Sequence, residues 1–364
     1  ERSQKVRFVP ISLKLTAQKV VCLDLGETAQ LFWEEANRVP QASFSSDAPE
    51  IVPVDTLGQI IGKAEGTAHI TITSENRQTF VTRVEVGRDL SVRREKAVMM
   101  FTGDIMCAVK HQRLASGHQH DYFDSFRRVR DILSGADFTA GVLETTSIDR
   151  APFEFEQLRL LTGAPNCNSP STFISAVAAA GFNAVVTANN HNSDCGVEGL
   201  KAVDSEIRRC GMLNIGSMGH SLVMTDVKGI KVAVIATTMI TNNTGWDLSK
   251  SGLVNPAGIY SRDYFTELVN SARRMGAEFI AAYQHWGSMN SPRIRKDQAE
   301  EAQFMADAGA DLIIGSHPHM VQRFSYIGAA DGRLVPCAYS LGNFLTTMSE
   351  LSGNRDSAPS ESIM

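Results

Sequence analysis

The hydrophobic and polar positions of this chain follow two different patterns, and the change occurs near residue 97. From Val6 to Val86, short segments of alternating apolar and polar residues are separated by turn residues, as in Thr67–Ile72. Such alternation places successive side chains on opposite faces of a half-buried strand. Because several segments of this kind occur within residues 6–87, we predict a small all-β domain built as an antiparallel sandwich.

From Ala97 onward, apolar segments alternate with segments of helical periodicity, which is typical of an α/β domain. We predict strands at residues 97–102, 138–143, 184–187, 231–236, 279–283, 312–314 and 337–340, and helices at residues 122–133, 171–180, 197–209, 262–275 and 296–308. The turn-rich residues 241–259 predict a surface excursion near the functional site. Polar and charged residues between the two patterns predict a linker, so the expected domains are 6–87 and 97–364, joined by 88–96.

Composition and charge exclude several classes of protein. The formal net charge is -5 and the basic residues are scattered, which argues against nucleic acid as a partner. The sequence contains no run of ~18 apolar residues and no signal-peptide pattern at its start, so we expect membrane contact only through a segment outside this sequence. The six cysteines include no CxxC pair, which argues against a zinc ribbon; disulfides and buried free thiols both remain open.

Polar residues suited to chemistry directly follow apolar strands. Ligand sites of open α/β sheets gather outside the carboxyl ends of the strands, so these residues are expected to converge. Each residue taken alone is a common turn former or cap. Together they form a set of hard oxygen atoms and imidazoles that suits a divalent cation, with manganese, iron, zinc and calcium as candidates. The set comprises Asp104, Glu144, Asn190, His191, His285, His317 and His319.

The spacing of two histidines and the position of one carboxylate predict one or two cations per chain. His317 and His319 are two residues apart, so both can face one site while each binds a different metal. Glu144 is placed to bridge such a pair, and two-metal centres of this type serve phosphate and ester hydrolysis. The remaining histidines lack this context and are expected to be surface or structural residues: His69, His111, His118, His120 and His220.

Six ordered motifs within residues 97–345 resemble the poly-gamma-glutamate capsule protein CapA family. They are Phe101–Met106, Leu143–Glu144, Ala188–Gly196, His285–Gly287, Gly309–His319 and Tyr339–Phe344. The family is similar to calcineurin-like metallophosphoesterases, so the resemblance implies an α/β four-layer sandwich of two sheets flanked by helices. A divalent metal and a peptide or poly-gamma-glutamate polymer as the substrate class are implied as well.

The resemblance also implies roles for individual residues. Glu144 would bridge two metals, one completed by Asn190, His285 and His317 and the other by Asp104 and His319. His191 would act as general acid or electrostatic helper, oriented by Asp194. Trp286 and Asn343 would contact the substrate. Met106 departs from the family pattern of related phosphoesterases, which carry histidine at this place, so the second metal is short of one ligand and a mononuclear site is the alternative.

The N-terminal segment resembles the bacterial immunoglobulin-like domain of group 2. The resemblance rests on residues 45–55, 58–61 and 66–70, although Phe44 stands where that family usually has tryptophan. Such modules are spacers or adhesive units of secreted and surface proteins. The resemblance therefore implies an extracytoplasmic protein, on the cell surface or anchored to the membrane.

Two functions from different classes follow from these observations. The first is a metal-dependent enzyme acting on poly-gamma-glutamate or a related cell-envelope peptide polymer, by hydrolysis or by acid/base chemistry beside a carbonyl, such as epimerisation. The second is a non-catalytic accessory or scaffold subunit of a capsule polymer synthesis and export complex. Retention of the whole ligand set favours the enzyme, and Met106 favours the accessory subunit.

Overall fold

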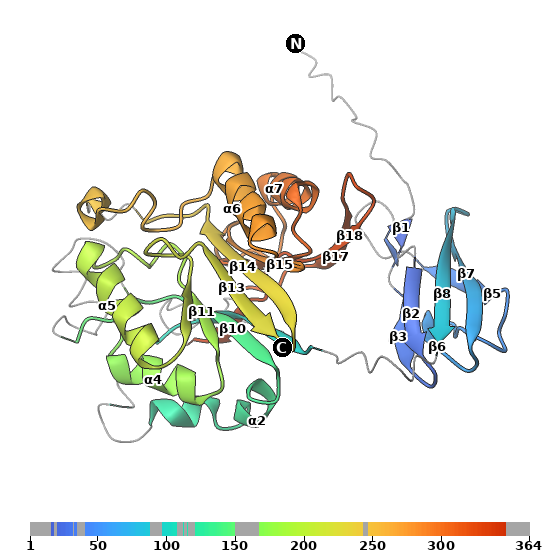
Figure 1. Cartoon of the computed structure of the whole chain (residues 1–364), viewed down its shortest axis with the longest axis horizontal. Coiled ribbons are helices and arrows are strands. Elements are labelled where there is room, and N and C mark those ends of the chain that lie inside the picture. Colours follow the sequence, from blue (N-terminus) through green and yellow to red (C-terminus); the bar gives the residue numbers. More distant parts are fainter. Residues whose placement is uncertain are drawn as a thin grey trace, which may run out of the picture. The chain divides into compact units, whose positions relative to one another are not determined.

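The computed structural model describes two compact units, Glu1–Arg94 and Glu95–Met364 (Figure 1). The described residues are 16–17, 20–31, 33–34, 41–87, 97–107, 112, 115, 121–149, 167–242 and 247–346. The predicted linker, residues 88–96, lies outside them, as do His111, His118 and His120.

The N-terminal unit is built from strands alone in its described part. Its eight strands are β1 Thr16–Ala17, β2 Val20–Asp24, β3 Thr28–Gln30, β4 Trp33–Glu34, β5 Ala42–Ser46, β6 Gln59–Ile61, β7 Gly66–Ser74 and β8 Thr79–Gly87. A four-stranded sheet runs in the order β2-β8-β7-β5, and two smaller sheets pair β1 with β4 and β3 with β6. Ala68, Ile70 and Ile72 alternate along β7 into an apolar core.

The N-terminal sheet is not wholly antiparallel, which corrects the predicted arrangement. β2 pairs with β8 in parallel, with Val21 opposite Val84. A parallel pair needs a long connection, and the chain between β2 and β8 supplies one. The alternating pattern of a strand gives its buried face but not the direction of its partner.

The second unit has a mixed α/β fold with two largely parallel sheets, as predicted. The five-stranded sheet has the order β12-β11-β10-β9-β19, and the six-stranded sheet has the order β13-β14-β15-β16-β18-β17 with antiparallel strands at both edges. The strands of the first sheet are β9 Met99–Ile105, β10 Phe138–Leu143, β11 Ala184–Val186, β12 Leu213–Ile215 and β19 Asn343–Leu345. Those of the second are β13 Leu222–Val227, β14 Ile230–Thr238, β15 Phe279–His285, β16 Leu312–Ser316, β17 Phe324–Gly328 and β18 Leu334–Ala338.

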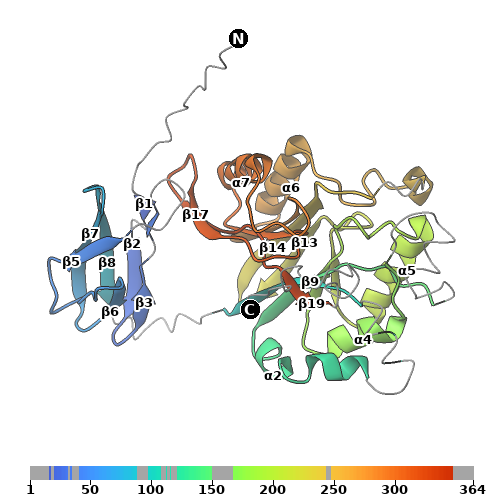
Figure 2. The same cartoon turned by 180° about the vertical axis from the view of Figure 1, so that it is seen from behind.

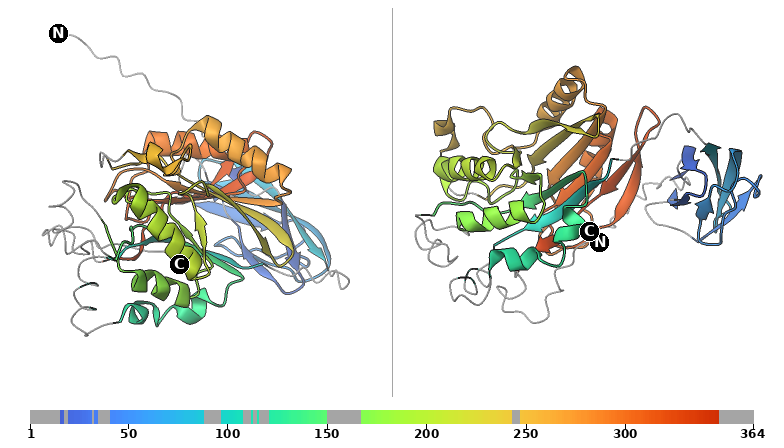
Figure 3. Two further views of the ribbon diagram at one scale, coloured as in Figure 1. Left: turned by 60° about the vertical axis from the view of Figure 1, so that its left-hand side comes forward. Right: turned by 60° about the horizontal axis from the view of Figure 1, so that its bottom comes forward.

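Helices cover the outer faces of both sheets (Figures 2 and 3). They are η1 Tyr122–Phe126, α2 Arg130–Leu133, α4 Ser171–Ala179, α5 Gly196–Arg209, η2 Leu248–Ser251, α6 Arg262–Arg274 and α7 Lys296–Ala308. The single helix predicted at residues 122–133 is divided into η1 and α2, because Phe123 and Ile132 are exposed and do not share a buried face with Phe126. Among the described residues, no helix is long and apolar enough to span a bilayer.

Three apolar clusters hold this unit together as four layers. One joins α6 and α7 to the six-stranded sheet, a second joins α4 and α5 to the five-stranded sheet, and the third lies between the sheets. In the third cluster, Val142 of β10 and Val234 of β14 are both fully buried. Strands covered on both faces read as continuous apolar runs, which explains why β10 was visible in the sequence.

Replacing Tyr283 by phenylalanine is expected to lower the free energy of unfolding by ~1–3 kcal/mol. The Tyr283 hydroxyl, from the six-stranded sheet, donates to the carbonyl oxygens of Thr102 at 3.1 Å and Ala140 at 3.2 Å in the other sheet. The ring is buried, so water does not replace the lost bonds. Urea denaturation measures the difference, and equal stability of both proteins would contradict this role.

Cutting the chain between Gly87 and Lys96 is expected to release two pieces that fold independently, because each unit has its own apolar core. The piece from residue 93 onward is expected to keep all metal binding, since every predicted ligand lies after that point. Circular dichroism during thermal unfolding and metal analysis of each piece provide the measurements. Loss of a cooperative transition from both pieces would refute independent folding.

Candidate metal centre

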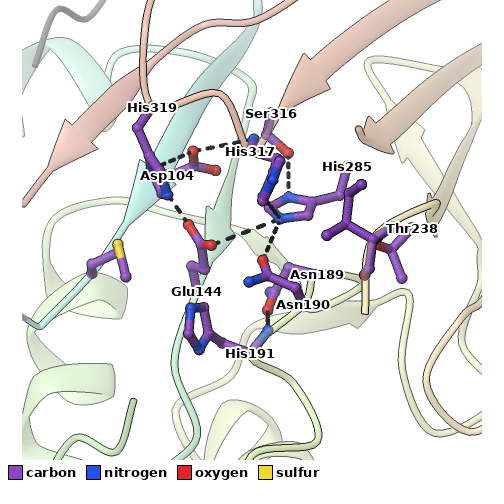
Figure 4. A network of polar contacts seen from close by, with 12 residues as sticks. Asp104, Glu144, Asn189, Asn190, His191, Thr238, His285, Ser316, His317 and His319 are labelled. Atoms are coloured by element: carbon purple, nitrogen blue, oxygen red, sulfur yellow. Dashed lines mark hydrogen bonds and ion pairs between the residues drawn. The ribbon is translucent and has the colours of Figure 1, made fainter. Parts of the chain in front are cut away.

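The predicted ligands lie together at the carboxyl ends of strands from both sheets. Asp104 belongs to β9, and Glu144 directly follows β10, its neighbour in the five-stranded sheet. His285 ends β15, and His317 follows β16 in the six-stranded sheet. Figure 4 shows these side chains pointing toward a common centre, with Asn190 from the loop after β11. Strands that occupy different sheets thus supply one site.

Two groups of donor atoms share the Glu144 carboxylate. The first consists of Glu144, His285 and His317, the second of Asp104, Glu144 and His319, and within each group the donor atoms lie within 4.8 Å of one another. Glu144 Oε1 is 3.7 Å from His285 Nε2, and Glu144 Oε2 is 3.8 Å from His319 Nδ1. The two oxygens therefore face different histidines, which is the arrangement that a bridging ligand requires.

Carboxylate oxygens at this centre are buried and lack hydrogen bonds within the described part of the chain. Both oxygens of Glu144 and Oδ1 of Asp104 are in this state, and both residues are 0% exposed. Burial raises the pKa of Glu144 to about 7, although the nearby His319 lowers it. Buried charges in proteins are normally paired or bind metals. A divalent cation therefore fits the donors present.

Two imidazoles at the first donor group have lowered pKa values. Burial lowers the pKa of His285 well below its ordinary value and lowers that of His317 to about 4. Both rings are therefore neutral near pH 7, as metal ligands must be. His317 Nδ1 lies 3.2 Å from His285 Nε2, and the Ser316 hydroxyl holds the other nitrogen of His285 at 2.8 Å. Such a partner fixes the orientation of a metal-binding imidazole.

The loop that carries His317 and His319 has an unusual backbone. His317 has φ of 93° and His319 has φ of 57°, values in the left-handed region that side-chain-bearing residues seldom adopt. The backbone N–H of His317 donates to Asp104 Oδ2 at 3.3 Å, which ties the loop to β9. Such conformations persist where surrounding contacts impose them, and they cluster at functional sites.

Asn343 holds His319 from β19. Its side-chain oxygen lies 2.8 Å from His319 Nδ1, and its amide donates to the His319 carbonyl oxygen at 3.2 Å. Burial lowers the pKa of His319, but Glu144 and Asp104 raise it to a net value of about 9. The structure thus gives Asn343 contacts with a candidate ligand, whereas the resemblance implied contact with substrate.

Asn190 is oriented by a residue that the sequence did not single out. Asn190 Oδ1 lies 2.8 Å from His285 Nε2, and its amide donates to Asn242 Oδ1 at 3.1 Å. This second bond turns the Asn190 oxygen toward the centre. Asn242 lies in the turn-rich residues 241–259 that were expected near the site, but its position alone gave no reason to choose it.

His191 and Asp194 form a buried pair beside this centre. His191 Nδ1 is 2.6 Å from Asp194 Oδ2, and Asp194 is 0% exposed. Burial lowers the pKa of His191, but Cys167 and Asp194 raise it well above its ordinary value. The amide of Asn242 lies 3.3 Å from the same His191 nitrogen. The orienting contact implied for Asp194 is therefore present.

Trp286 is placed differently from the expectation. Its indole is 0% exposed, lies in the apolar cluster beneath α6 and α7, and donates to the Tyr339 carbonyl oxygen at 2.8 Å. A substrate contact would require an exposed ring, so the described contacts give Trp286 a packing role. Its indole also closes the space beside Gly315, where any side chain would collide with the backbone of Tyr339.

Other predicted features have the following surroundings. His69 pairs with Asp47 on the surface, and His220 contacts Arg208 and Asp204, in agreement with structural or surface roles. The Met106 side chain is 6% exposed, and its sulfur accepts a hydrogen bond from the Thr346 hydroxyl at 3.9 Å. The cysteines described as free thiols are Cys107, Cys167, Cys195, Cys210 and Cys337.

Replacing His317 or Asn190 by alanine is expected to lower the affinity for a cation at the first donor group more than the affinity at the second donor group. The loss should exceed the ~10–100-fold in affinity that removal of a supporting contact costs. Isothermal titration with Mn²⁺ and metal analysis measure the effect, with the exposed Asn270→Ala as the control for Asn190→Ala. Unchanged binding by both site variants would remove these residues from the ligand set.

Comparisons with known proteins agree with the resemblance in the sequence. A family model for the bacterial capsule synthesis protein PGA_cap matches residues 98–348. The capsule biosynthesis protein CapA of Bacillus anthracis is 27% identical over 287 residues, which cover 73% of this chain and 64% of that protein. The PGA biosynthesis protein CapA of Bacillus subtilis (strain 168) is 27% identical over 258 residues, which cover 67% of this chain and 62% of that protein.

This chain thus spans less than two thirds of the length of these curated relatives. Among solved structures, a sulfate thiohydrolase SoxB of Thermus thermophilus is 14% identical with a TM-score of 0.36, over 60% of this chain and 38% of that one. A TM-score this low supports no assignment. The family assignment therefore rests on the sequence match, which extends over most of the second unit. The chain belongs to the bacterial capsule synthesis protein PGA_cap family.

Proposed function

We propose that this chain is a metal-dependent enzyme of the CapA type that acts on poly-gamma-glutamate or a related peptide polymer of the cell envelope. The observation that carries the proposal is the sharing of Glu144 between two buried donor groups. A scaffold has no physical need for two buried carboxylates and three histidines around one point, because buried charge without partners is costly. The names of the curated relatives support the substrate class.

In this proposal Glu144 would contribute to two cation positions, one completed by Asn190, His285 and His317 and the other by Asp104 and His319. A bound divalent cation supplies Lewis-acid polarisation of a carbonyl or phosphoryl oxygen. The mixture of carboxylate, amide and imidazole donors supports a cation of the manganese, iron or zinc type. A fold of the calcineurin-like metallophosphoesterase type is part of the same proposal, supported by the four layers and by ligands at the carboxyl ends of both sheets.

His191 would transfer a proton at the reacting group, and Asp194 would keep the imidazole in one orientation through the 2.6 Å contact to Nδ1. This role is supported by the position of His191 outside both donor groups that contain Glu144. The same pair could return a proton beside a carboxylate. Hydrolysis and epimerisation therefore use the same residues and differ in the product.

The accessory-subunit function remains the second candidate because of Met106. A thioether is a weak ligand for the hard cations that suit Asp104 and Glu144, so the second donor group is the poorer one. In that case the chain would serve as a binding component of the capsule machinery. In either case the N-terminal unit would be an immunoglobulin-like spacer, and the chain would lie outside the cytoplasm in the cell envelope, which the capsule-related names of the relatives support.

The deciding experiment combines metal analysis with two substrates. The purified chain is analysed for bound metals and then incubated with poly-gamma-glutamate and with a generic phosphodiester, with Glu144→Gln as the control. Formation of shorter or epimerised polymer by the parent chain, but not by Glu144→Gln, supports the enzymatic function. A chain that binds no metal and leaves both substrates unchanged would support the accessory role instead.

A further inference from the structure

A third group of donor atoms lies beside the two that share Glu144, and it contains sulfur. Cys167, His191 and Asp194 each offer one donor atom, and these atoms lie within 4.8 Å of one another. None of the three belongs to the other two groups. Asp194 is 0% exposed and His191 is 8% exposed, whereas Cys167 is partly exposed. The group is thus nearly enclosed.

The backbone holds Cys167 firmly against Asp194. The N–H of Cys167 donates to Asp194 Oδ2 at 2.7 Å, while its carbonyl oxygen accepts from the backbone and the hydroxyl of Thr146 at 3.0 and 2.7 Å. Thr146 follows Glu144 by two residues, so the segment that carries the shared carboxylate also anchors the cysteine. These hydrogen bonds use only protein atoms and fix the backbone of Cys167, which lowers the entropic cost of binding.

The combination of donor types favours a cation over simple hydrogen-bonded support. A thiol is a weak donor and a weak acceptor, and the imidazole already has a carboxylate partner, so hydrogen-bonded support alone does not require a cysteine at this position. Thiolate, imidazole and carboxylate are all ligands of Zn²⁺, and three protein ligands leave one position open in a tetrahedral site. The neighbouring Cys195 differs because its sulfur lies 3.4 Å from the Thr146 hydroxyl and it belongs to no donor group.

We propose that Cys167, His191 and Asp194 form a separate site for a thiophilic divalent cation of the zinc type, next to the Glu144 centre. The proposal goes beyond the proposed function, which assigns His191 and Asp194 to proton transfer and gives Cys167 no role. A cation held here occupies a nitrogen of His191. Occupancy of this site therefore blocks proton transfer by the same ring or changes its rate.

Cobalt distinguishes this site from the Glu144 centre, because only a thiolate ligand produces a sulfur-to-Co²⁺ charge-transfer band. The full chain is stripped with a chelator and titrated with Co²⁺ while absorption and stoichiometry are recorded. The parent chain is expected to show the band. Cys167→Ser is expected to lose the band and to bind one cation fewer, whereas Cys195→Ser, the matched control, keeps both.

Glu144→Gln separates this proposal from the proposed function. This variant is expected to lose the cations of the Glu144 centre. It is expected to retain the charge-transfer band, since Glu144 is not part of the group that contains Cys167. If the parent chain fills the Glu144 centre but shows no band, the third site is refuted while the proposed function stands. If the band appears but Glu144→Gln changes nothing else, the proposed function fails and the third site stands.

A second measurement needs no variant. Bound Zn²⁺ is expected to slow alkylation of Cys167 by iodoacetamide in the parent chain, followed by peptide mass spectrometry, and a chelator is expected to restore the rate. Alkylation of Cys195 in the same sample serves as the internal control. Equal rates for Cys167 with and without Zn²⁺ would show that the cluster is a hydrogen-bonded support for His191, and would overturn the proposal.

Discussion

Glu144→Gln is expected to empty both positions of the Glu144 centre and to abolish turnover. The shared carboxylate provides one oxygen toward His285 and the other toward His319, so its charge serves both donor groups. Loss of a contact that merely supports a ligand costs ~10–100-fold, and loss of a shared ligand is expected to cost more at each position. Metal analysis and Mn²⁺ titration of the variant measure the loss.

The same variant is expected to be as stable as the parent chain, or more stable, when both are free of metal. Neither oxygen of Glu144 has a hydrogen-bond partner among the described residues, and burial raises the pKa of the group to about 7. Removing a buried charge of this kind removes a desolvation penalty. The exposed Glu267→Gln is the matched control. Full metal content in Glu144→Gln would contradict the bridging role.

His191→Ala is expected to reduce turnover by ~10²–10⁴-fold while the Glu144 centre keeps its cations. His191 belongs to neither donor group that contains Glu144, and its Nδ1 is engaged by Asp194 at 2.6 Å. The test therefore measures turnover of the polymer substrate and the cation content of the Glu144 centre for each variant. His220→Ala, on the surface beside Arg208, is the control and is expected to change neither quantity.

An empty Glu144 centre in His191→Ala would show that the roles of ligand and proton carrier are assigned wrongly. Unchanged turnover with full metal content would instead show that His191 does not take part in the reaction. Because the two quantities are measured on the same preparations, each result points to a different error.

Several parts of the site were predictable because the sequence places them directly after buried strands. Asp104, Glu144, His285 and His317 all follow or end apolar runs, and parallel strands bring their carboxyl ends to one edge. The same reasoning predicts the positions of most strands of the second unit. It failed for the four edge strands β12, β13, β17 and β19, which are less buried than the central strands and therefore do not read as continuous apolar runs.

Other contacts could not be predicted because they join residues that local periodicity does not relate. Asn242 reaches Asn190 and His191 from the loop after β14, and Cys167 reaches Asp194 from a segment before α4. Periodicity reports which face of an element is buried, and says nothing of which distant residue meets it. Trp286 shows the same limit, since a tryptophan beside a candidate ligand can face either the site or the core.

The sequence by itself determined the change from a β-rich segment to an α/β segment, the family, and the residue types that can bind a divalent cation. These depend on local pattern and on motifs within single segments. The tertiary structure decided that the Glu144 oxygens face different histidines, that Asn343 holds His319, and that β2 runs parallel to β8. Each of these depends on strand order and on side-chain direction, which are properties of packing between segments far apart in the chain.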